Sequence, residues 1–175
     1  KAYRFSIAWT RIYPQGNGPV NVRGLQHYSE VIDTCLAHGL TPIVTMYHFD
    51  LPAALDAAGG WNNRATIDAF VQYARTLFEQ FGDRVKYWLT INEINILLHQ
   101  QVVGGGIVFK EGENKLEINY QAAHHQLLAS GLATKIAHEV DSENMVGCML
   151  AGGSHYPYTC RPEDYQEAIN RDREG

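Results

Sequence analysis

The sequence of 175 residues lacks any hydrophobic run near the roughly 18 residues that a membrane-spanning helix requires, and no stretch is typical of a signal peptide. It also lacks an excess of basic residues, because 14 Lys and Arg stand against 19 Asp and Glu and the net charge is −5. No basic stripe is present that could replace the counterions of a phosphate backbone. We therefore expect neither a membrane nor a nucleic acid as the partner of this protein.

Cysteine is scarce, and the three that occur, Cys35, Cys148 and Cys160, have no metal-ligand spacing. Cys35 falls on the face of a predicted helix and Cys148 in a predicted strand. We therefore expect buried free thiols, which suit a reducing cytoplasm.

Motifs for metals, nucleotide cofactors and activated nucleophiles are absent as well. The histidines do not group at a metal-binding spacing (His48, His99, His124, His125, His155). The first strand–helix loop has neither Gly-x-Gly-x-x-Gly nor Gly-Lys-Ser/Thr, and no Ser or Cys occupies a nucleophile elbow. We expect no metal and no cofactor. His124 and His125 lie in the middle of a predicted helix, where packing or a surface position is the ordinary explanation.

What the sequence does contain is a repeated order of strands and helices, in a globular composition with 45% hydrophobic and 19% charged residues. Apolar patterning predicts strands at 2–9, 41–46, 87–91 and 145–150. Apolar residues spaced by threes and fours predict helices at 23–38, 64–81 and 116–140, and a last helix from about residue 163. A helical turn is expected around 94–101 and a flexible loop from 104 to 115.

This order of elements predicts a parallel sheet with right-handed crossovers. A doubly wound α/β sheet and part of a (β/α)8 barrel both fit. A barrel takes about 250 residues, so four units would be roughly half of one. The chain opens with Lys1, almost inside a strand, and ends within a predicted helix. We expect residues 1–175 to form a single incomplete domain of a longer protein.

Polar side chains follow two of the predicted strands. Asn92 and Glu93 come directly after 87–91, and His48 and Asp50 come after 41–46. The carboxyl ends of parallel strands share one edge, which is where α/β enzymes hold catalytic groups. Glu93 can equally cap the next helix or pair with a cation, and Asp50 can simply cap the turn that follows it.

Arg4 lies on the second face of the first strand, opposite the larger aromatic residues. A guanidinium that is buried there needs a partner, because an unpaired buried charge is costly. No acid within the strand can serve, so the partner comes from elsewhere in the protein. The alternative is an Arg at the rim that extends its charged end into water.

An amide, an imidazole and a carboxylate at one rim, together with aromatic residues, suit a sugar. Trp9, Tyr47 and Trp88 are the aromatic residues that we expect there. Cleavage of a glycosidic bond needs two carboxyl groups, one of which donates a proton. Glu93 can be that donor if burial and a neighbouring anion keep it protonated. No second acid in this chain has an equally convincing strand end.

Four ordered motifs resemble glycoside hydrolase family 1, the retaining β-glucosidases of (β/α)8 fold, over essentially the whole chain. They are Tyr-Arg-Phe-Ser-Ile-Ala-Trp-Thr-Arg-Ile-Tyr-Pro at 3–14, Thr-Met-Tyr-His-Phe-Asp-Leu-Pro at 45–52, Gly-Gly-Trp-Asn-Asn at 59–63 with Phe-Gly-Asp-Arg-Val at 81–85, and Thr-Ile-Asn-Glu at 90–93. The first, second and fourth of these resemble the family's second, third and fourth strands. The resemblance implies about half a barrel, covering strands 2 to 5.

The resemblance also implies roles for four residues. Glu93 would be the general acid/base, and Asn92 would hold the 2-hydroxyl of the sugar. His48 would contact another sugar hydroxyl, and Arg4 would lie beside the nucleophile, which is outside this chain. Regular alternation sends Asn92 and Glu93 to opposite faces of the strand, so we expect irregular backbone or a bulge at this point.

Phe49 stands where many family members have Trp, and it resembles the bacterial branch that acts on 6-phospho-β-glucosides. The last helix, 163–173, resembles that branch too. The implied partner is a small phosphorylated β-glucoside, and the implied location is the cytoplasm. The alternatives are a β-glucosidase or β-galactosidase of the same family that takes unphosphorylated sugars, and a non-catalytic sugar-binding barrel.

An excerpt of this kind has consequences for its behaviour. Without the nucleophile we expect the 175 residues alone to be inactive, and open sheet edges predict aggregation or swapping. The full-length protein can be a homo-oligomer. A half-barrel that is stable alone or as a dimer is the other possibility.

Overall fold

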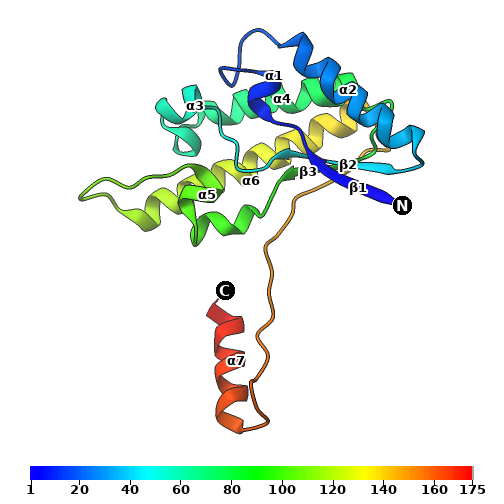
Figure 1. Cartoon of the computed structure of the whole chain (residues 1–175). Coiled ribbons are helices and arrows are strands. Elements are labelled where there is room, and N and C mark those ends of the chain that lie inside the picture. Colours follow the sequence, from blue (N-terminus) through cyan, green and yellow to red (C-terminus); the bar gives the residue numbers. More distant parts are fainter. Residues whose placement is uncertain (175) are drawn as a thin grey trace.

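The computed structural model describes residues 1–174, and its four strands form one parallel sheet in the order β1-β2-β3-β4 (Figure 1). The strands are β1 (Ala2–Ser6), β2 (Thr41–Tyr47), β3 (Tyr87–Ile91) and β4 (Met145–Gly147). Each strand pairs with the next one along the chain, after a connection that carries at least one helix. The predicted parallel β-α sheet is confirmed.

The long helices are α2 (Val22–Ala37), α4 (Ala65–Phe81), α6 (Lys115–Val140) and α7 (Pro162–Glu174), within a residue or two of the predicted positions. Short helical segments accompany them within residues 1–174: α1 (Trp9–Ile12) precedes α2, and α3 (Ala53–Ala57), η1 (Gly60–Asn62), η2 (Ile94–Leu98) and α5 (Gln101–Gly105) lie between the long helices. Helices α2, α4 and α6 lie on one side of the sheet (Figure 1). Among residues 1–174, no long helix packs on the other side.

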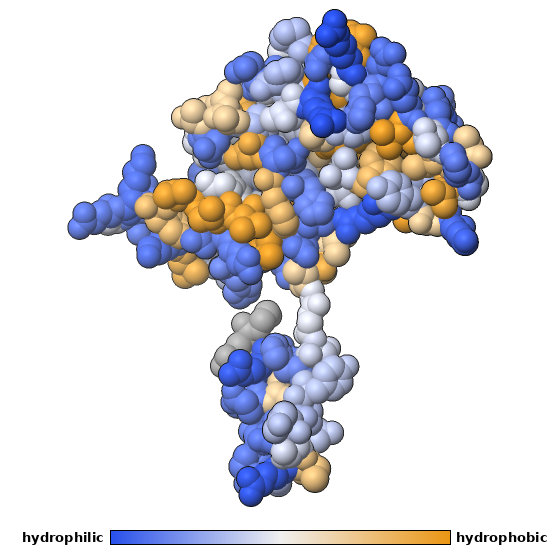
Figure 2. Space-filling model, in the orientation of Figure 1, coloured by the Kyte–Doolittle hydropathy of each residue, from blue (hydrophilic) through white to orange (hydrophobic). Residues whose placement is uncertain are grey.

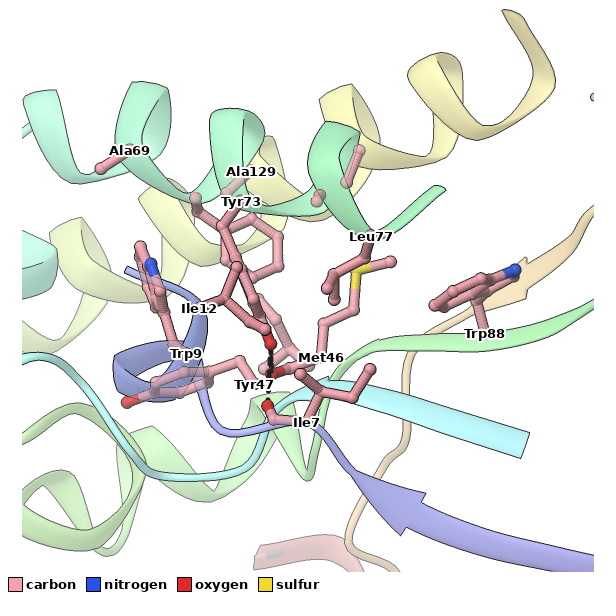
Figure 3. Packing of buried hydrophobic residues seen from close by; sticks show 14 of the residues in the cluster. Ile7, Trp9, Ile12, Met46, Tyr47, Ala69, Tyr73, Leu77, Trp88 and Ala129 are labelled. Carbon is pink, nitrogen blue, oxygen red and sulfur yellow. Dashed lines mark hydrogen bonds between the residues drawn. The ribbon is translucent and has the colours of Figure 1, made fainter. Parts of the chain in front are cut away.

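The core lies between the sheet and these helices. α4 buries Ile67, Phe70, Ala74 and Leu77, which recur at helical spacing and so form one apolar stripe. Met46 and Trp88 meet that stripe from the sheet, as Figure 3 shows.

Tyr73 of α4 ties this layer to the ends of two strands. Its hydroxyl lies 2.8 Å from the carbonyl oxygen of Ile7 and 3.0 Å from that of Met46, and it donates to them (Figure 3). The side chain is fully buried. The hydroxyl therefore joins the chain just after β1 to the end of β2, where the candidate site begins.

The first strand ends earlier than the predicted range 2–9. Ala8 N donates to the Tyr28 hydroxyl and Trp9 N donates to the Asp50 carboxylate, both at 2.8 Å. Ile7 N still donates to Thr45 O of β2, so Trp9 N is the next donor that a longer strand would direct to β2, and Asp50 takes it instead. The chain turns into α1 at Trp9. Tertiary partners thus override the alternating pattern.

β1 is an edge strand, and Tyr3 is 50% exposed on it. β4 is likewise short, ending at Gly147 rather than at residue 150. Within residues 1–174 both outer strands pair with one neighbour only, so fewer backbone hydrogen bonds fix their ends.

The predicted flexible loop from 104 to 115 begins inside a helix. Gly104 and Gly105 form the end of α5, where a Cβ on Gly104 would come within 3.0 Å of the Leu97 Cα. A Cβ on Gly105 would come within 2.9 Å of the Leu97 Cδ1. These glycines allow α5 to pack closely on η2, so their role is close approach rather than flexibility.

Outside the core, Figure 2 shows hydrophobic side chains gathered over α5 and the segment after it. The exposed apolar residues of this region are Val102, Val103, Val108 and Leu116. Beyond β4 an extended segment leads to α7, which lies apart from the sheet (Figure 1). His155 bonds Asp172 of α7 through its backbone N and Nδ1, at 2.7 and 2.8 Å.

The cysteine prediction is partly wrong. Cys35 is buried in α2 as expected, whereas Cys148 and Cys160 are exposed and lie outside any strand. All three are free thiols. No helix among residues 1–174 combines the length and apolar character that crossing a membrane requires.

Candidate active site

The strand ends that carry the predicted site residues lie side by side. Tyr47 of β2 is paired with Ile91 of β3, so His48 and Asn92 are the next residues of adjacent strands. Asn92 N donates to Tyr47 O at 2.9 Å, which extends the pairing of these two strands by one residue. The parallel register therefore brings both polar segments to the same edge of the sheet.

Arg4 reaches this edge from β1. Its Nη2 donates to Asn92 Oδ1 at 2.5 Å, and its Nε donates to Thr45 Oγ1 at 2.9 Å. Its Nη1 lies 2.7 Å from the sulfur of Met149. The guanidinium thus has polar partners from three other strands or strand ends, but within residues 1–174 it forms no ion pair with an acid.

The contact between Arg4 and Asn92 fixes the Asn92 amide. Arg4 can only donate, so the amide oxygen of Asn92 faces it and the Nδ2 donor points elsewhere. Asn92 is only 3% exposed, so this orientation is held in a packed setting. A buried amide that keeps a free donor is suited to a hydroxyl of a ligand.

Glu93 has the irregular backbone that the sequence predicts. Its φ and ψ are 46° and 52°, the left-handed region that costs a non-glycine residue roughly 1–2 kcal/mol. The pairing of Tyr87 with Met145 and Leu89 with Gly147, if continued, would make Asn92 N the donor to Met149 O. Instead Ile94 N donates to Met149 O at 3.1 Å, and Met149 N donates to Ile91 O at 3.0 Å. Asn92 and Glu93 therefore form a bulge against the segment after β4.

Within residues 1–174 no contact supports either structural role considered for Glu93, a helix cap or a partner of a cation. Glu93 is the residue that precedes η2, yet its side chain makes no capping hydrogen bond. Among residues 1–174 it also belongs to no ion pair. The side chain is partly buried at the strand-end edge. A half-buried carboxyl on strained backbone without a structural partner is a candidate for chemistry.

Asp50 organises the loop that carries His48. Its carboxylate accepts from His48 N at 3.2 Å and from Trp9 N at 2.8 Å, so it ties this loop to α1. Burial raises the pKa of Asp50, while these two N–H donors act in the opposite direction. Asp50 thus has the turn-capping role that was open for it. The loop leaves His48 exposed and puts Phe49 at φ 66°.

The aromatic residues predicted for this rim are not there. Trp9, Tyr47 and Trp88 are between 0% and 1% exposed and pack among the helices, as Figure 3 shows. Trp9 stacks on Tyr73 with 5.3 Å between ring centroids, and Trp88 meets Phe78 edge-on. The rings are therefore core residues. The prediction was wrong because the strand pattern alone does not distinguish the side of the sheet that the helices cover from the open side.

The mid-helix histidines behave as expected. His125 is buried, and its two ring nitrogens contact Trp61 O and the Gln121 amide at 2.7 Å each. His124 is exposed. The His125 partners lie on α6 and η1, away from the strand ends.

Three residues at the edge escaped the sequence reasoning: Thr45, Met149 and Asn95. Thr45 shares a face with Arg4 by simple alternation across the paired strands, and that signal could have been used. The positions of Met149 and Asn95 depend on the bulge, so no local pattern indicates them.

A separate hollow of about 500 Å³ lies between β1 and α2, away from the strand ends. Its lining is mostly apolar and includes Tyr3, Val31 and Leu40. The convergence of Arg4, Asn92 and Glu93 on one edge, rather than the size of a hollow, identifies the candidate site.

Comparisons with known proteins show which families and structures this chain is similar to. The sequence model of Glycosyl hydrolase family 1 matches residues 1–174. Among curated proteins, the 6-phospho-beta-glucosidase AscB of Escherichia coli is 54% identical over 99% of this chain. The aryl-phospho-beta-D-glucosidase BglH of Bacillus subtilis is 47% identical over 99%. Among solved structures, the beta-glucosidase from Thermotoga maritima in complex with glucoimidazole has a TM-score of 0.80 at 41% identity over 97% of this chain.

The chain spans 37% of the length of these two curated relatives and 38% of the solved structure. Its sheet follows the strand order of one segment of a (β/α)8 barrel. The chain is therefore roughly half of such a barrel, and of the two architectures that fitted the sequence, the barrel is the right one.

Proposed function

The chain belongs to glycosyl hydrolase family 1, and from this premise we propose that it is part of a retaining β-glycosidase in which Glu93 is the general acid/base. In the first step the nucleophile, from outside residues 1–174, forms a bond to the anomeric carbon. The bond to the leaving oxygen breaks, and that oxygen takes the Glu93 proton. In the second step Glu93 removes a proton from water, which attacks the same carbon and releases the nucleophile.

The bulge at Glu93 is the observation that carries this proposal. Without it Asn92 and Glu93 would point to opposite faces of β3. With Ile94 N rather than Asn92 N bonded to Met149 O, both residues are at the edge where Arg4 also ends. A protein does not need such strain to pack a strand end, so the geometry favours a functional cause.

The other site residues have supporting roles in the proposed reaction. Asn92, with its amide oxygen held by Arg4, offers Nδ2 to a hydroxyl next to the anomeric centre. His48 is exposed at the next strand end and is available to another hydroxyl. Arg4 would lie beside the nucleophile and help to keep it ionised, because a nearby cation lowers a carboxyl pKa.

The substrate that we propose is a 6-phospho-β-glucoside. This rests on the names of the two relatives at 54% and 47% identity and on Phe49 at the loop beside His48. A sugar phosphorylated during uptake is found in the bacterial cytoplasm, which is therefore the proposed location. A plain β-glucosidase is the second candidate, favoured by the solved structure at 41% identity.

Hydrolysis by the full-length protein tests this choice. The assay compares phenyl β-glucoside with its 6-phosphate at equal concentrations. We expect a higher kcat/KM for the phosphate, and a preference for the free sugar would remove the phosphorylated substrate from the proposal. Hydrolysis of either sugar by the wild type separates an enzyme from a sugar-binding barrel, because a barrel without catalysis would hydrolyse neither. Loss of that activity in Glu93→Gln then tests the role of Glu93.

For the 175 residues alone we propose an incomplete domain without activity. β1 and β4 are open edges, and apolar residues are exposed over α5 (Figure 2). Such surfaces promote association between copies. A sharp melting transition of this piece as a monomer would contradict the proposal.

A further inference from the structure

The backbone around Glu93 is held by the segment that follows β4. Met149 N donates to Ile91 O on one side of the bulge, and Ile94 N donates to Met149 O on the other. Met149 thus brackets Asn92 and Glu93. These two bonds join main-chain groups, so every sequence could form them once the bulge exists.

Asn95 adds a side-chain lock directly after the bulge. Its Nδ2 donates to Ala151 O at 2.8 Å, and its Oδ1 accepts from Ala151 N, also at 2.8 Å. The amide has the same donor and acceptor as a peptide group, so Asn95 pairs with Ala151 as a strand residue would. It continues the pairing of the two segments past the point where the bulge has interrupted it.

The Asn95 lock matters because, within the part of the chain that the structure describes, the Glu93 side chain has no polar contact of its own that fixes its direction. No hydrogen bond or ion pair from residues 1–174 restrains the Glu93 carboxyl. Its direction is therefore set by its own backbone, which is in a left-handed conformation that relaxes unless its surroundings enforce it. Asn95 is two residues away, and its side chain fixes this backbone to the segment after β4, whereas the Asn92 side chain ties it to Arg4 of β1.

We propose that Asn95 is a positioning residue for the acid/base: by clasping Ala151 it holds the bulge at Asn92 and Glu93 and so aims the Glu93 carboxyl at the leaving oxygen. The inference rests on the proposed function of Glu93. It adds a residue that touches no substrate and acts only through the backbone of Glu93.

The test uses the full-length protein with Asn95→Ala, which removes both hydrogen bonds. The matched control is Asn144→Ala. Asn144 also makes two amide hydrogen bonds, with Nδ2 donating to Ala137 O at 2.9 Å and Oδ1 accepting from Trp88 Nε1 at 3.3 Å. It is buried just before β4, at the amino ends of the strands, whereas the candidate site lies at their carboxyl ends. Both variants lose similar contacts, but only Asn95→Ala loosens the candidate site.

The readout is kcat/KM for two substrates, the phenyl and the 2,4-dinitrophenyl β-glucosides, each with the 6-phosphate if the wild type requires it. Dinitrophenolate leaves without a proton, whereas phenolate depends on the general acid. We expect Asn95→Ala to lower kcat/KM roughly tenfold to a hundredfold for the phenyl substrate, as misplacement of a catalytic group does. The dinitrophenyl substrate should change less than about threefold, since its first step needs no acid. Asn144→Ala should leave both substrates nearly unchanged while lowering the melting temperature.

An equal loss on both substrates would overturn the inference, because it would indicate general damage rather than a misplaced acid. So would an unchanged kcat/KM for the phenyl substrate. Glu93→Gln serves as the reference and should show the same dependence on leaving group in stronger form. If Glu93→Gln instead keeps full activity on the phenyl substrate, the proposed function fails and the role of Asn95 fails with it. A selective loss in Glu93→Gln but not in Asn95→Ala would leave the acid/base in place and remove Asn95 alone.

Discussion

Replacing Tyr73 with Phe tests how the candidate site is attached to its scaffold. The Tyr73 hydroxyl is fully buried and lies within 3.0 Å of two carbonyl oxygens, Ile7 O and Met46 O. Burial holds the pKa of Tyr73 well above its usual value, so the hydroxyl remains a donor at any ordinary pH. It has one proton, so Phe removes one full hydrogen bond and leaves two buried carbonyls without this partner. The expected loss is about 1–3 kcal/mol in the free energy of unfolding.

The assay is urea unfolding of the full-length protein, with Tyr3→Phe as the control. Tyr3 is half exposed on the edge strand, so its loss of a hydroxyl should change the free energy of unfolding by less than about 0.5 kcal/mol. If Tyr73→Phe is no more destabilising than Tyr3→Phe, the two strand ends are not held together through this hydroxyl. The reasoning that α4 fixes the geometry of the site would then be refuted.

Further predictions concern the site itself. Arg4→Lys keeps a positive charge but cannot bond Thr45 and Asn92 at the same time. The kcat/KM of the full-length protein should therefore fall roughly tenfold to a hundredfold, which corresponds to the loss of one charge-assisted hydrogen bond. An unchanged kcat/KM would mean that catalysis does not require Arg4 to orient the Asn92 amide. Burial raises the pKa of Asp50, so the folded state binds its proton more tightly than the unfolded state, and the stability of the wild type relative to Asp50→Asn should rise as pH falls from 7 towards about 4. A difference that stays constant across this range in thermal unfolding, or that shifts in favour of the variant, would contradict the assigned burial. The Asp172 carboxyl has its pKa lowered by the His155 backbone and ring, so its contact is present at neutral pH and should be lost as pH falls below about 4, which the NMR shifts of α7 would report.

The sequence predicted the long elements because their patterns are repeated many times. The stripe from Ile67 to Leu77 recurs over several turns, and no alternative structure satisfies it. Short segments such as α1 and α5 were missed because single contacts determine them. α1 exists where the Tyr28 hydroxyl and Asp50 capture two N–H groups, and α5 where Gly104 lets the backbone approach Leu97.

For the site, the conflict between alternation and chemistry was informative. Two adjacent polar residues could not both face a ligand on a regular strand, and the bulge at Glu93 resolves that conflict as expected. The aromatic residues were misplaced because a strand pattern does not say which face the helices cover. The Asn95 lock was beyond prediction, since it depends on how far the bulge shifts one segment against another.

The central claim is that the Glu93 carboxyl gives its proton to the departing oxygen. The most direct measurement is kcat/KM of full-length Glu93→Gln for phenyl β-glucoside, or its 6-phosphate, beside the wild type. We expect a loss of roughly a hundredfold to ten-thousandfold, the usual contribution of general acid catalysis. Activity within about twofold of the wild type would contradict the account, because an amide cannot supply that proton.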